Sequence, residues 1–453
     1  MRRRIEATLA TGLALTALLS LGGGCVDVGR DDLPEIMKFD PTTGEVPQPT
    51  ILVINPQTGL IDLSLAGIDV PEDCSTVAAT AVAQCEFNQY METLDGFPTV
   101  LGASAPTSAP LDMDTVDDSD NLLVLDETGT KIIPSDQRSV TFDATDNLLD
   151  IIPNEGWDVG HTYVIAVRGY ENGVKSAAGK TVVADVVFYL LRQSESLTCG
   201  AVTAEAVSDD CKFYKLLIQQ DPDHPEAVRE NLLALEETRQ MMASSGLWDG
   251  LNLFGMPKEE VAVAWAFPIH TASVAELQPA LGMLPEVRSD KEIFIPVKGT
   301  IDASSVTRFS LGDQTGSVFL LDLTALAVGN MAGGLPVFEP TYTDGGILLT
   351  AQADLTDGDL YCLILKNTIK NEEGQKLVPS PTTVLLRSRG VLVDDEGHST
   401  VMGVSDADAT ELEAGRLQLA ELLDNDQFIS LTGLEREDIA YIYAFTFPDP
   451  TSN

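Results

Sequence analysis

The sequence predicts a mainly β protein built from two antiparallel β-sandwiches in tandem, each with an inserted helix. Short apolar strands alternate with turns rich in Gly, Pro, Asn and Asp, and each half holds one stretch with helical apolar spacing. The same motifs also recur in the same order along the chain. At 453 residues the chain has room for two or three domains, and its 44% hydrophobic residues are enough to fill their cores.

The repeat is based on two fully apolar strands at residues 163–167 and 361–365. Each follows an acidic glycine turn and leads through a polar turn into an expected strand that ends in Leu-Leu-Arg, at 190–192 and 385–387. A helical stretch and an apolar strand then close each copy. Five such matches in one order are not expected by chance, so the sequence predicts a tandem repeat.

The central strands indicate where the inserted helix packs. Because residues 163–167 and 361–365 are apolar at every position, both of their faces are expected to be covered. A sandwich covers only one face, so the helix of each copy is expected to cover the other. Short strands and frequent turns of this kind are typical of Ig-like sandwiches. The apolar helix positions are Val228, Leu232, Leu235 and Met242 in the first copy, and Leu412, Leu419 and Leu423 in the second.

These features divide the chain into five parts. The first copy has the longer insertion before its closing strand, as expected of a surface loop. The expected parts are a lipoprotein signal peptide at 1–24, an N-terminal extension packing on the first repeat at 25–97, repeat one at 98–270, a connector at 271–290, and repeat two at 291–450.

The N-terminus predicts export. Residues 2–4 are arginines, and residues 7–21 form an apolar stretch too short to span a membrane. Gly22–Gly24 then precede Cys25, which resembles a bacterial lipobox, although Gly22 stands where that motif has leucine. The resemblance implies lipid attachment at Cys25 and anchoring to the outer membrane or cell surface, with plain secretion as the alternative.

The charge balance of the chain argues against a nucleic-acid partner. Seventy Asp and Glu residues against 27 Lys and Arg residues give a net charge of −43. Phosphate contacts need a basic face, so we expect no nucleic-acid partner. A salty or calcium-rich exterior suits such a chain, because ions screen its self-repulsion.

The six cysteines agree with export to an oxidising compartment. No CxxC spacing occurs, which disfavours a cysteine-ligated metal. Cys362 lies within an apolar strand and is expected to be a buried thiol. A local disulfide of the expected loop size stabilises a protein by about 3 kcal/mol in the chain-entropy model. The two expected disulfides are Cys74 with Cys85, and Cys199 with Cys211.

Further motifs suggest a family. They include Phe39-Asp40-Pro41 with Val46-Pro47, a strand at 59–63, Leu94-Asp95-Gly96-Phe97, turns at Gly179 and Gly374, and Trp265-Ala266-Phe267. Their order resembles the N-terminal domain of bacterial virulence-factor lipases, which is related to bacterial Ig-like surface modules. The resemblance is best over 39–270, and the second copy repeats its latter part. In that family the lipase activity resides in a following α/β-hydrolase domain. The resemblance therefore implies a surface scaffold whose lipase domain is absent.

The sequence shows no strong catalytic motif. An α/β-hydrolase needs Gly-x-Ser-x-Gly, and the nearest match, residues 403–407, lacks the second glycine. Ser405 is instead expected to cap a helix. The four histidines have no metal-binding spacing and are predicted to be surface or turn residues: His161, His224, His270 and His398. We therefore expect no enzyme activity and, apart from calcium, no cofactor.

One acidic cluster is a candidate calcium site. Calcium takes six to eight oxygen ligands from acidic loops. The spacing does not match the EF-hand pattern, so a solvated acidic loop is the alternative. The cluster consists of Asp112, Asp114, Asp117, Asp118 and Asp120.

Together these features predict a non-enzymatic cell-surface lipoprotein of tandem Ig-like modules, serving adhesion, display or envelope architecture. Two alternatives stay open: an accessory module of a separately encoded exported lipase or other hydrolase, and a hydrolase without a recognisable motif. The expected partners are the outer membrane, through the lipid, and a protein or glycan ligand that the fold itself does not identify.

Overall fold

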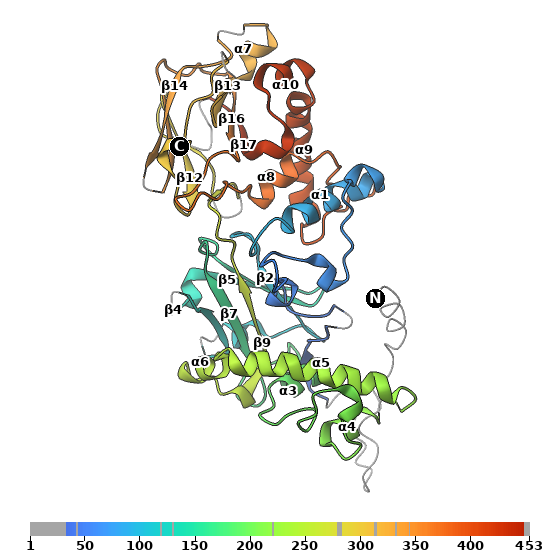
Figure 1. Ribbon diagram of the computed structural model, residues 1–453. Coiled ribbons are helices and arrows are strands. Elements are labelled where there is room, and N and C mark those ends of the chain that lie inside the picture. Colours follow the sequence, from blue (N-terminus) through green and yellow to red (C-terminus); the bar gives the residue numbers. More distant parts are fainter. Residues whose placement is uncertain are drawn as a thin grey trace.

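The computed structural model describes residues 33–41, 44–117, 120–128, 131–219, 222–278, 283–311, 315–330, 333–343 and 345–447. Cys25 and the predicted signal peptide lie outside these residues. The described chain is mainly β, and its two halves lie end to end with helices along their sides (Figure 1). Within the described part of the chain, no helix combines the length and apolar character needed to cross a membrane.

The first half contains two antiparallel sheets that share one hydrophobic core. One sheet has the order β2-β6-β5 and the other β4-β3-β7-β9. The strands are β2 (Ala103–Pro106), β3 (Leu122–Asp126), β4 (Lys131–Ile132), β5 (Arg138–Asp143), β6 (Leu148–Pro153), β7 (Thr162–Arg168) and β9 (Val261–Pro268).

The second half also has two antiparallel sheets around a core of its own. Their orders are β10-β12-β15-β14, with β11 also paired to β12, and β13-β16-β17. The strands are β10 (Val274–Ala275), β11 (Glu286–Val287), β12 (Glu292–Lys298), β13 (Val318–Asp322), β14 (Phe338–Thr343), β15 (Gly346–Ala351), β16 (Leu360–Lys366) and β17 (Ile439–Thr446).

The central pairings have the same register in both halves. Asp126 of β3 is opposite Tyr163, just as Asp322 of β13 is opposite Tyr361. The last strand of each half continues the sheet, because β9 pairs with β7 and β17 pairs with β16. The register shifts near the end of both pairings. All five residues of β3 and of β13 are buried, as expected for strands with both faces covered.

The expected Leu-Leu-Arg strands are wrong, because these residues end short helices. α3 (Val186–Leu191) is capped by Asp185, and α8 (Pro381–Leu386) is capped by Ser380 with Pro381 in its first turn. Caps of this kind satisfy the free N–H groups of a first turn and allow an apolar run to form a helix. The arginine that follows each helix donates to the first residue of the closing strand: Arg192 to the Val261 carbonyl and Arg387 to the Ile439 carbonyl.

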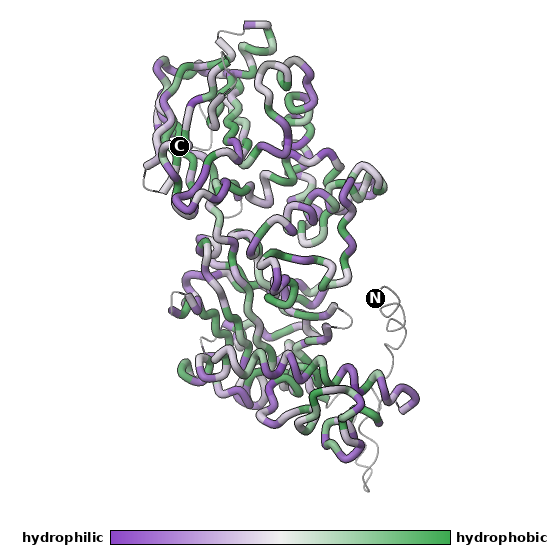
Figure 2. The backbone as a smooth tube through the Cα atoms, viewed as in Figure 1, coloured by the Kyte–Doolittle hydropathy of each residue, from purple (hydrophilic) through white to green (hydrophobic). Residues whose placement is uncertain are grey.

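Each half has more helices than the single one expected. α3 packs on β9 and α8 packs on β17, while the long helices α5 (Pro225–Ser244) and α9 (Asp406–Leu423) pack on α3 and α8. Figure 2 shows hydrophilic and hydrophobic residues interspersed along α5, which lies across the bottom of the view. The short helices thus contact the closing strands, whereas the sequence predicted that the long helix of each half covers residues 163–167 or 361–365. The other helices include α2 (Met113–Val116), α4 (Lys212–Leu217), α6 (Leu247–Leu253), α7 (Leu323–Ala327) and α10 (Asp426–Thr432).

The N-terminal extension contacts both halves, although the sequence predicted contact with the first alone. β1 (Glu35–Met37) pairs in parallel with β8 (Val182–Ala184) of the first half. α1 (Val82–Met91), in contrast, packs against α8 of the second half. There, the Ser388 hydroxyl donates to the Glu86 carboxylate at 2.7 Å. The extension therefore joins the two halves, as its path alongside both shows in Figure 1.

The expected connector at 271–290 is partly a structural element of the second half. Its strands β10 and β11 both pair with β12. The sequence did not reveal this, because two-residue strands carry no alternating pattern of their own.

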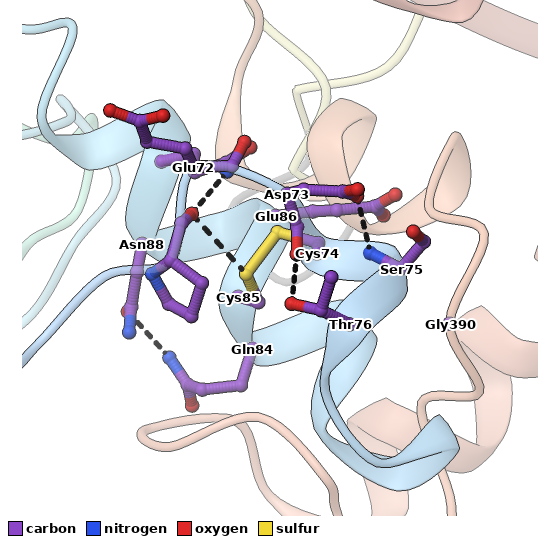
Figure 3. The surroundings of a disulfide bond; sticks show 12 residues. Glu72, Asp73, Cys74, Ser75, Thr76, Gln84, Cys85, Glu86, Asn88 and Gly390 are labelled. Atoms are coloured by element: carbon purple, nitrogen blue, oxygen red, sulfur yellow. Dashed lines mark hydrogen bonds between the residues drawn. A yellow bond between two sulfur atoms is a disulfide. The ribbon is translucent and has the colours of Figure 1, made fainter.

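Both expected disulfides are present. Cys74–Cys85 ties the turn before α1 to that helix, next to Gly390 of the second half (Figure 3). A Cβ at Gly390 would lie 2.3 Å from the Ala83 nitrogen, so only glycine permits this approach. Cys199–Cys211 closes a loop in the long insertion of the first half. Cys362 is a buried thiol, and burial raises its pKa to about 12.

Candidate functional site

An open groove of about 840 Å³ lies where the two halves meet. Most of its lining residues have polar side chains, which can form hydrogen bonds to a polar ligand. One wall is the turn before β7, and the other comes from the segment after β12 and the turn at 371–375 of the second half. The lining residues are Asp158, Val159, His161, Thr271, Ser273, Lys298, Gly299, Thr300, Asn371, Glu373 and Gln375.

The first wall is held by a buried tyrosine. The Tyr163 hydroxyl accepts a hydrogen bond of 2.9 Å from the backbone N–H of Asp158, five residues upstream. Desolvation on burial raises the pKa of Tyr163, so the hydroxyl stays neutral. The ring packs against Trp157 in a tilted arrangement, at a centroid distance of 4.6 Å, and stacks with Phe267 at 6.0 Å. The turn that carries Asp158 and His161 is therefore anchored to the core.

A buried carboxylate orients His161. Asp126 is the last residue of β3, and its side chain is 0% exposed, whereas that of His161 is 31% exposed. Nδ1 of His161 lies 3.1 Å from both oxygens of the Asp126 carboxylate. This geometry suits an N–H at Nδ1, which leaves Nε2 with a free lone pair.

Asp158 completes a group of three. One ligand atom from each of Asp126, Asp158 and His161 lies within 4.8 Å of the others. Asp158 is more exposed, at 53%, and its carboxylate lies 3.9 Å from the Lys131 ammonium. A histidine oriented by a carboxylate and placed next to a second carboxylate is a suitable metal ligand or proton acceptor.

The second wall is connected to the first half by a chain of side-chain hydrogen bonds. The Thr271 hydroxyl donates to Asp95 of the N-terminal extension and accepts from the Gln375 amide at 2.7 Å. The Asn371 amide in turn donates to Gln375 at 2.7 Å. The chain joins the extension, the connector and the second half, and it orders this side of the groove.

Lys298 also links the halves. It ends β12 of the second half, and its ammonium donates to the carbonyls of Trp157, at 3.0 Å, and of Glu155 in the first. Burial lowers the pKa of Lys298. Gly156 lies between these carbonyls in a left-handed conformation, and a Cβ there would meet the Thr99 oxygen at 2.7 Å.

Two more titratable groups are buried at this junction. His270 and Glu276 are each 1% exposed. Desolvation lowers the pKa of His270 to about 4 and raises the pKa of Glu276. Glu276 accepts a hydrogen bond from Thr99 at 2.8 Å, while among the described atoms its other oxygen and Nδ1 of His270 have no hydrogen-bond partner. Both groups therefore favour the neutral form.

The predicted calcium loop has a local structural role. Asp112 caps α2 by accepting from the Asp114 N–H at 3.2 Å, and Asp302 caps the corresponding turn of the second half. None of the described aspartates of the loop belongs to a group of three possible metal ligands, and Asp118 lies outside the described residues. Calcium binding here remains a prediction.

Sequence reasoning missed the group around His161. It placed His161 in a turn, where it lies, but gave it no role, and it noted Asp126 only as the last residue of a repeated strand. The available signal was an aspartate at the end of an otherwise apolar strand, since a buried carboxylate needs a partner. The prediction of a surface or turn position is wrong for His270, because that side chain is buried in the junction.

No protein-family model and no curated protein matches the sequence. Among solved structures, the S-layer protein rSbsC(31-844) matches with 9% identity and a TM-score of 0.17. The match covers 43% of this chain and 21% of that chain, so this chain spans about a fifth of the S-layer structure.

Proposed function

We propose that the chain is an exported, lipid-anchored surface protein in which two Ig-like modules present the groove between them to a polar ligand. The observation that carries the proposal is the strand order of the two halves. Ig constant-type domains have the sheet orders ABED and CFG. The orders β10-β12-β15-β14 and β13-β16-β17 of the second half correspond to these.

The first half supports the same interpretation. Its sheet β2-β6-β5 corresponds to BED, and β3-β7-β9 corresponds to CFG, with β4 as an added edge strand beside C. On this interpretation the helical segments are insertions between strands F and G in both modules. The shared register of the CFG strands supports an origin of the two modules from one unit.

A tyrosine corner in each half adds independent support. In Ig domains a tyrosine near the start of strand F donates or accepts a hydrogen bond with the backbone a few residues upstream. Tyr163 meets the Asp158 N–H at 2.9 Å, and Tyr361 meets the Thr356 N–H at 2.9 Å. The identical spacing of five residues supports two copies of one module, and we propose that this module is related to those that precede bacterial virulence-factor lipases.

The two disulfides are consistent with an exported protein. Cys25 in its lipobox-like context favours anchoring over free secretion. We propose binding rather than catalysis, with a glycan as the ligand class, because hydroxyl, amide and carboxylate groups line the groove from both halves.

The proposed lipid anchoring and localisation are tested by labelling cells with radioactive palmitate and then separating inner and outer membranes. We expect label in the native protein, no label in a Cys25→Ser variant, and native protein in the outer-membrane fraction. Protease added to intact cells should then degrade the native chain. An unlabelled native protein, or one that stays with the inner membrane, contradicts the proposed anchoring.

Ligand binding is tested with purified envelope polysaccharide in a titration. We expect Glu373→Arg, on the groove wall, to weaken binding at least 10-fold, about 1.4 kcal/mol. Glu396→Arg makes the same charge change on an exposed turn away from the groove lining and should have no effect. Equal behaviour of the two variants, or no binding by the native protein, contradicts a glycan site in the groove.

A further inference from the structure

We infer that Asp126, Asp158 and His161 form a binding site for a divalent transition metal, with Zn²⁺ as the best-matched ion. This inference concerns a metal rather than the glycan of the proposed function, and it stands on different atoms. The three ligand atoms already lie within 4.8 Å of one another. Ligands of one metal at bonds of about 2.0–2.2 Å are separated by less than that distance, so small side-chain movements bring them into coordination.

The three residues come from positions that the fold holds in place. Asp126 ends β3 opposite Tyr163, and His161 directly precedes β7. The backbone of Asp158 is fixed by the tyrosine corner. A site on such anchored positions loses little conformational entropy when it binds a metal.

The donor set favours a transition metal over calcium. One imidazole and two carboxylates suit Zn²⁺ or Mn²⁺, whereas Ca²⁺ takes six to eight oxygen ligands. Two carboxylates also neutralise a divalent cation, and the net charge of −43 raises the local cation concentration. Three protein ligands leave a coordination position open, and Asp158 and His161 both line the groove.

The second half serves as an internal comparison. The positions that match Asp126, Asp158 and His161 through the paired strands and the tyrosine corner are Asp322, Thr356 and Asp359. There the Asp322 carboxylate caps α7 by accepting from the Ala325 N–H at 2.8 Å. The framework therefore does not by itself create the ligand group, which depends on the side chains of the first half.

A metal held by both Asp126 and Nδ1 of His161 takes the place of the proton that these two groups share. Two other contacts that compete with the metal involve Asp158, and both are weak. The Lys131 ammonium lies 3.9 Å from Asp158, and both side chains are more than half exposed. Exposed ion pairs of this kind contribute at most about 1 kcal/mol and are screened by salt. The Tyr163 hydroxyl is 3.4 Å from the Asp158 carboxylate, near the limit of a hydrogen bond.

The test is calorimetric titration of the purified protein with ZnCl₂. We expect one equivalent to bind, and His161→Gln and Asp158→Asn each to weaken this binding at least about 10-fold. Asp158→Asn is informative because its side chain is half-exposed, so the variant should fold. An unchanged near-UV circular dichroism spectrum, which reports on the neighbouring Trp157, confirms that the variants are folded.

The matched control is His398→Gln. His398 also lies 3.1 Å from an aspartate, Asp406, but both side chains are largely exposed, and no third possible ligand joins them among the described residues. We expect this variant to bind Zn²⁺ like the native protein. The inference is overturned if folded His161→Gln and Asp158→Asn bind as tightly as the native protein, if His398→Gln alone loses binding, or if the native protein binds Ca²⁺ but not Zn²⁺.

Discussion

The two halves share their framework and differ in what is attached to it. Both have the same order of central strands, the same register, a tyrosine bonded to the backbone five residues upstream, and an arginine that reaches the start of the closing strand. They differ in the turn before the tyrosine, where the first half has Asp158 and His161 and the second has Thr356 and Asp359. Buried strands and their contacts thus define the scaffold, while exposed turns carry the chemistry.

The largest expected difference between the halves is in the aromatic core. Trp157 is fully buried against Tyr163 and Phe267, and Leu355 occupies the corresponding position of the second half. We expect Trp157→Ala to cost about 3–5 kcal/mol and Leu355→Ala to cost less, near 2 kcal/mol. Urea unfolding measures both, and hydrogen exchange in β7 and β16 shows which half is affected. An equal or larger cost at Leu355 would contradict the comparison.

The junction between the halves should be sensitive to acid. The pKa of His270 falls from 6.5 to about 4 in the folded protein, so between these values the unfolded chain binds more protons. Stability is therefore lost as the pH falls from 6.5 towards 4, by about 3 kcal/mol for this group. His270→Phe should remove this part of the pH dependence, which denaturant unfolding at several pH values measures.

The contribution of Glu276 to stability should have the opposite pH dependence to that of His270. Its pKa is raised above 4.5 in the folded protein, so there the folded state holds its proton more tightly than the unfolded chain. Stability is then lost as the pH rises through this range. Glu276→Gln should therefore gain stability relative to the native protein with increasing pH, and a constant difference between the two proteins would show that Glu276 is not held neutral.

The insertion of the first half should depend on its disulfide. Cys199–Cys211 closes a loop beside α4, around a small hydrophobic cluster of its own. Replacing both cysteines with serine should cost about 3 kcal/mol in the chain-entropy model. We expect faster hydrogen exchange in α4 and no change in β16 or β17 of the second half. A loss of protection across both halves would show that the insertion is not a local unit.

Removing the two tyrosine hydroxyls should have the smallest effects on stability, and these effects should be equal in the two halves. Tyr163→Phe and Tyr361→Phe each remove the hydroxyl that accepts from a backbone N–H. Each should cost about 1–2 kcal/mol, because the N–H loses its partner. Matched thermal or urea unfolding curves measure both variants, and a cost in only one half would break the equivalence of the two tyrosine corners.

Much of the framework follows from local pattern. The apolar runs at 163–167 and 361–365, the helical spacing in α5 and α9, and the cysteine spacing identified central strands, long helices and both disulfides. Leu-Leu-Arg was misassigned as a strand, because an apolar run of this length does not distinguish a strand from a buried helix. The caps Asp185 and Ser380 settle the choice by satisfying N–H groups of the first turn.

The sequence by itself determined the central and closing strands of the two halves, their long helices and the local cysteine pairs, because these depend on periodicity and short chain separations. Only the tertiary structure decided that Asp126 meets His161 across 35 positions of the chain, that α1 joins the second half, and that His270 and Glu276 lose contact with water. Such contacts depend on how separate elements pack together, and no local pattern of residues encodes that packing.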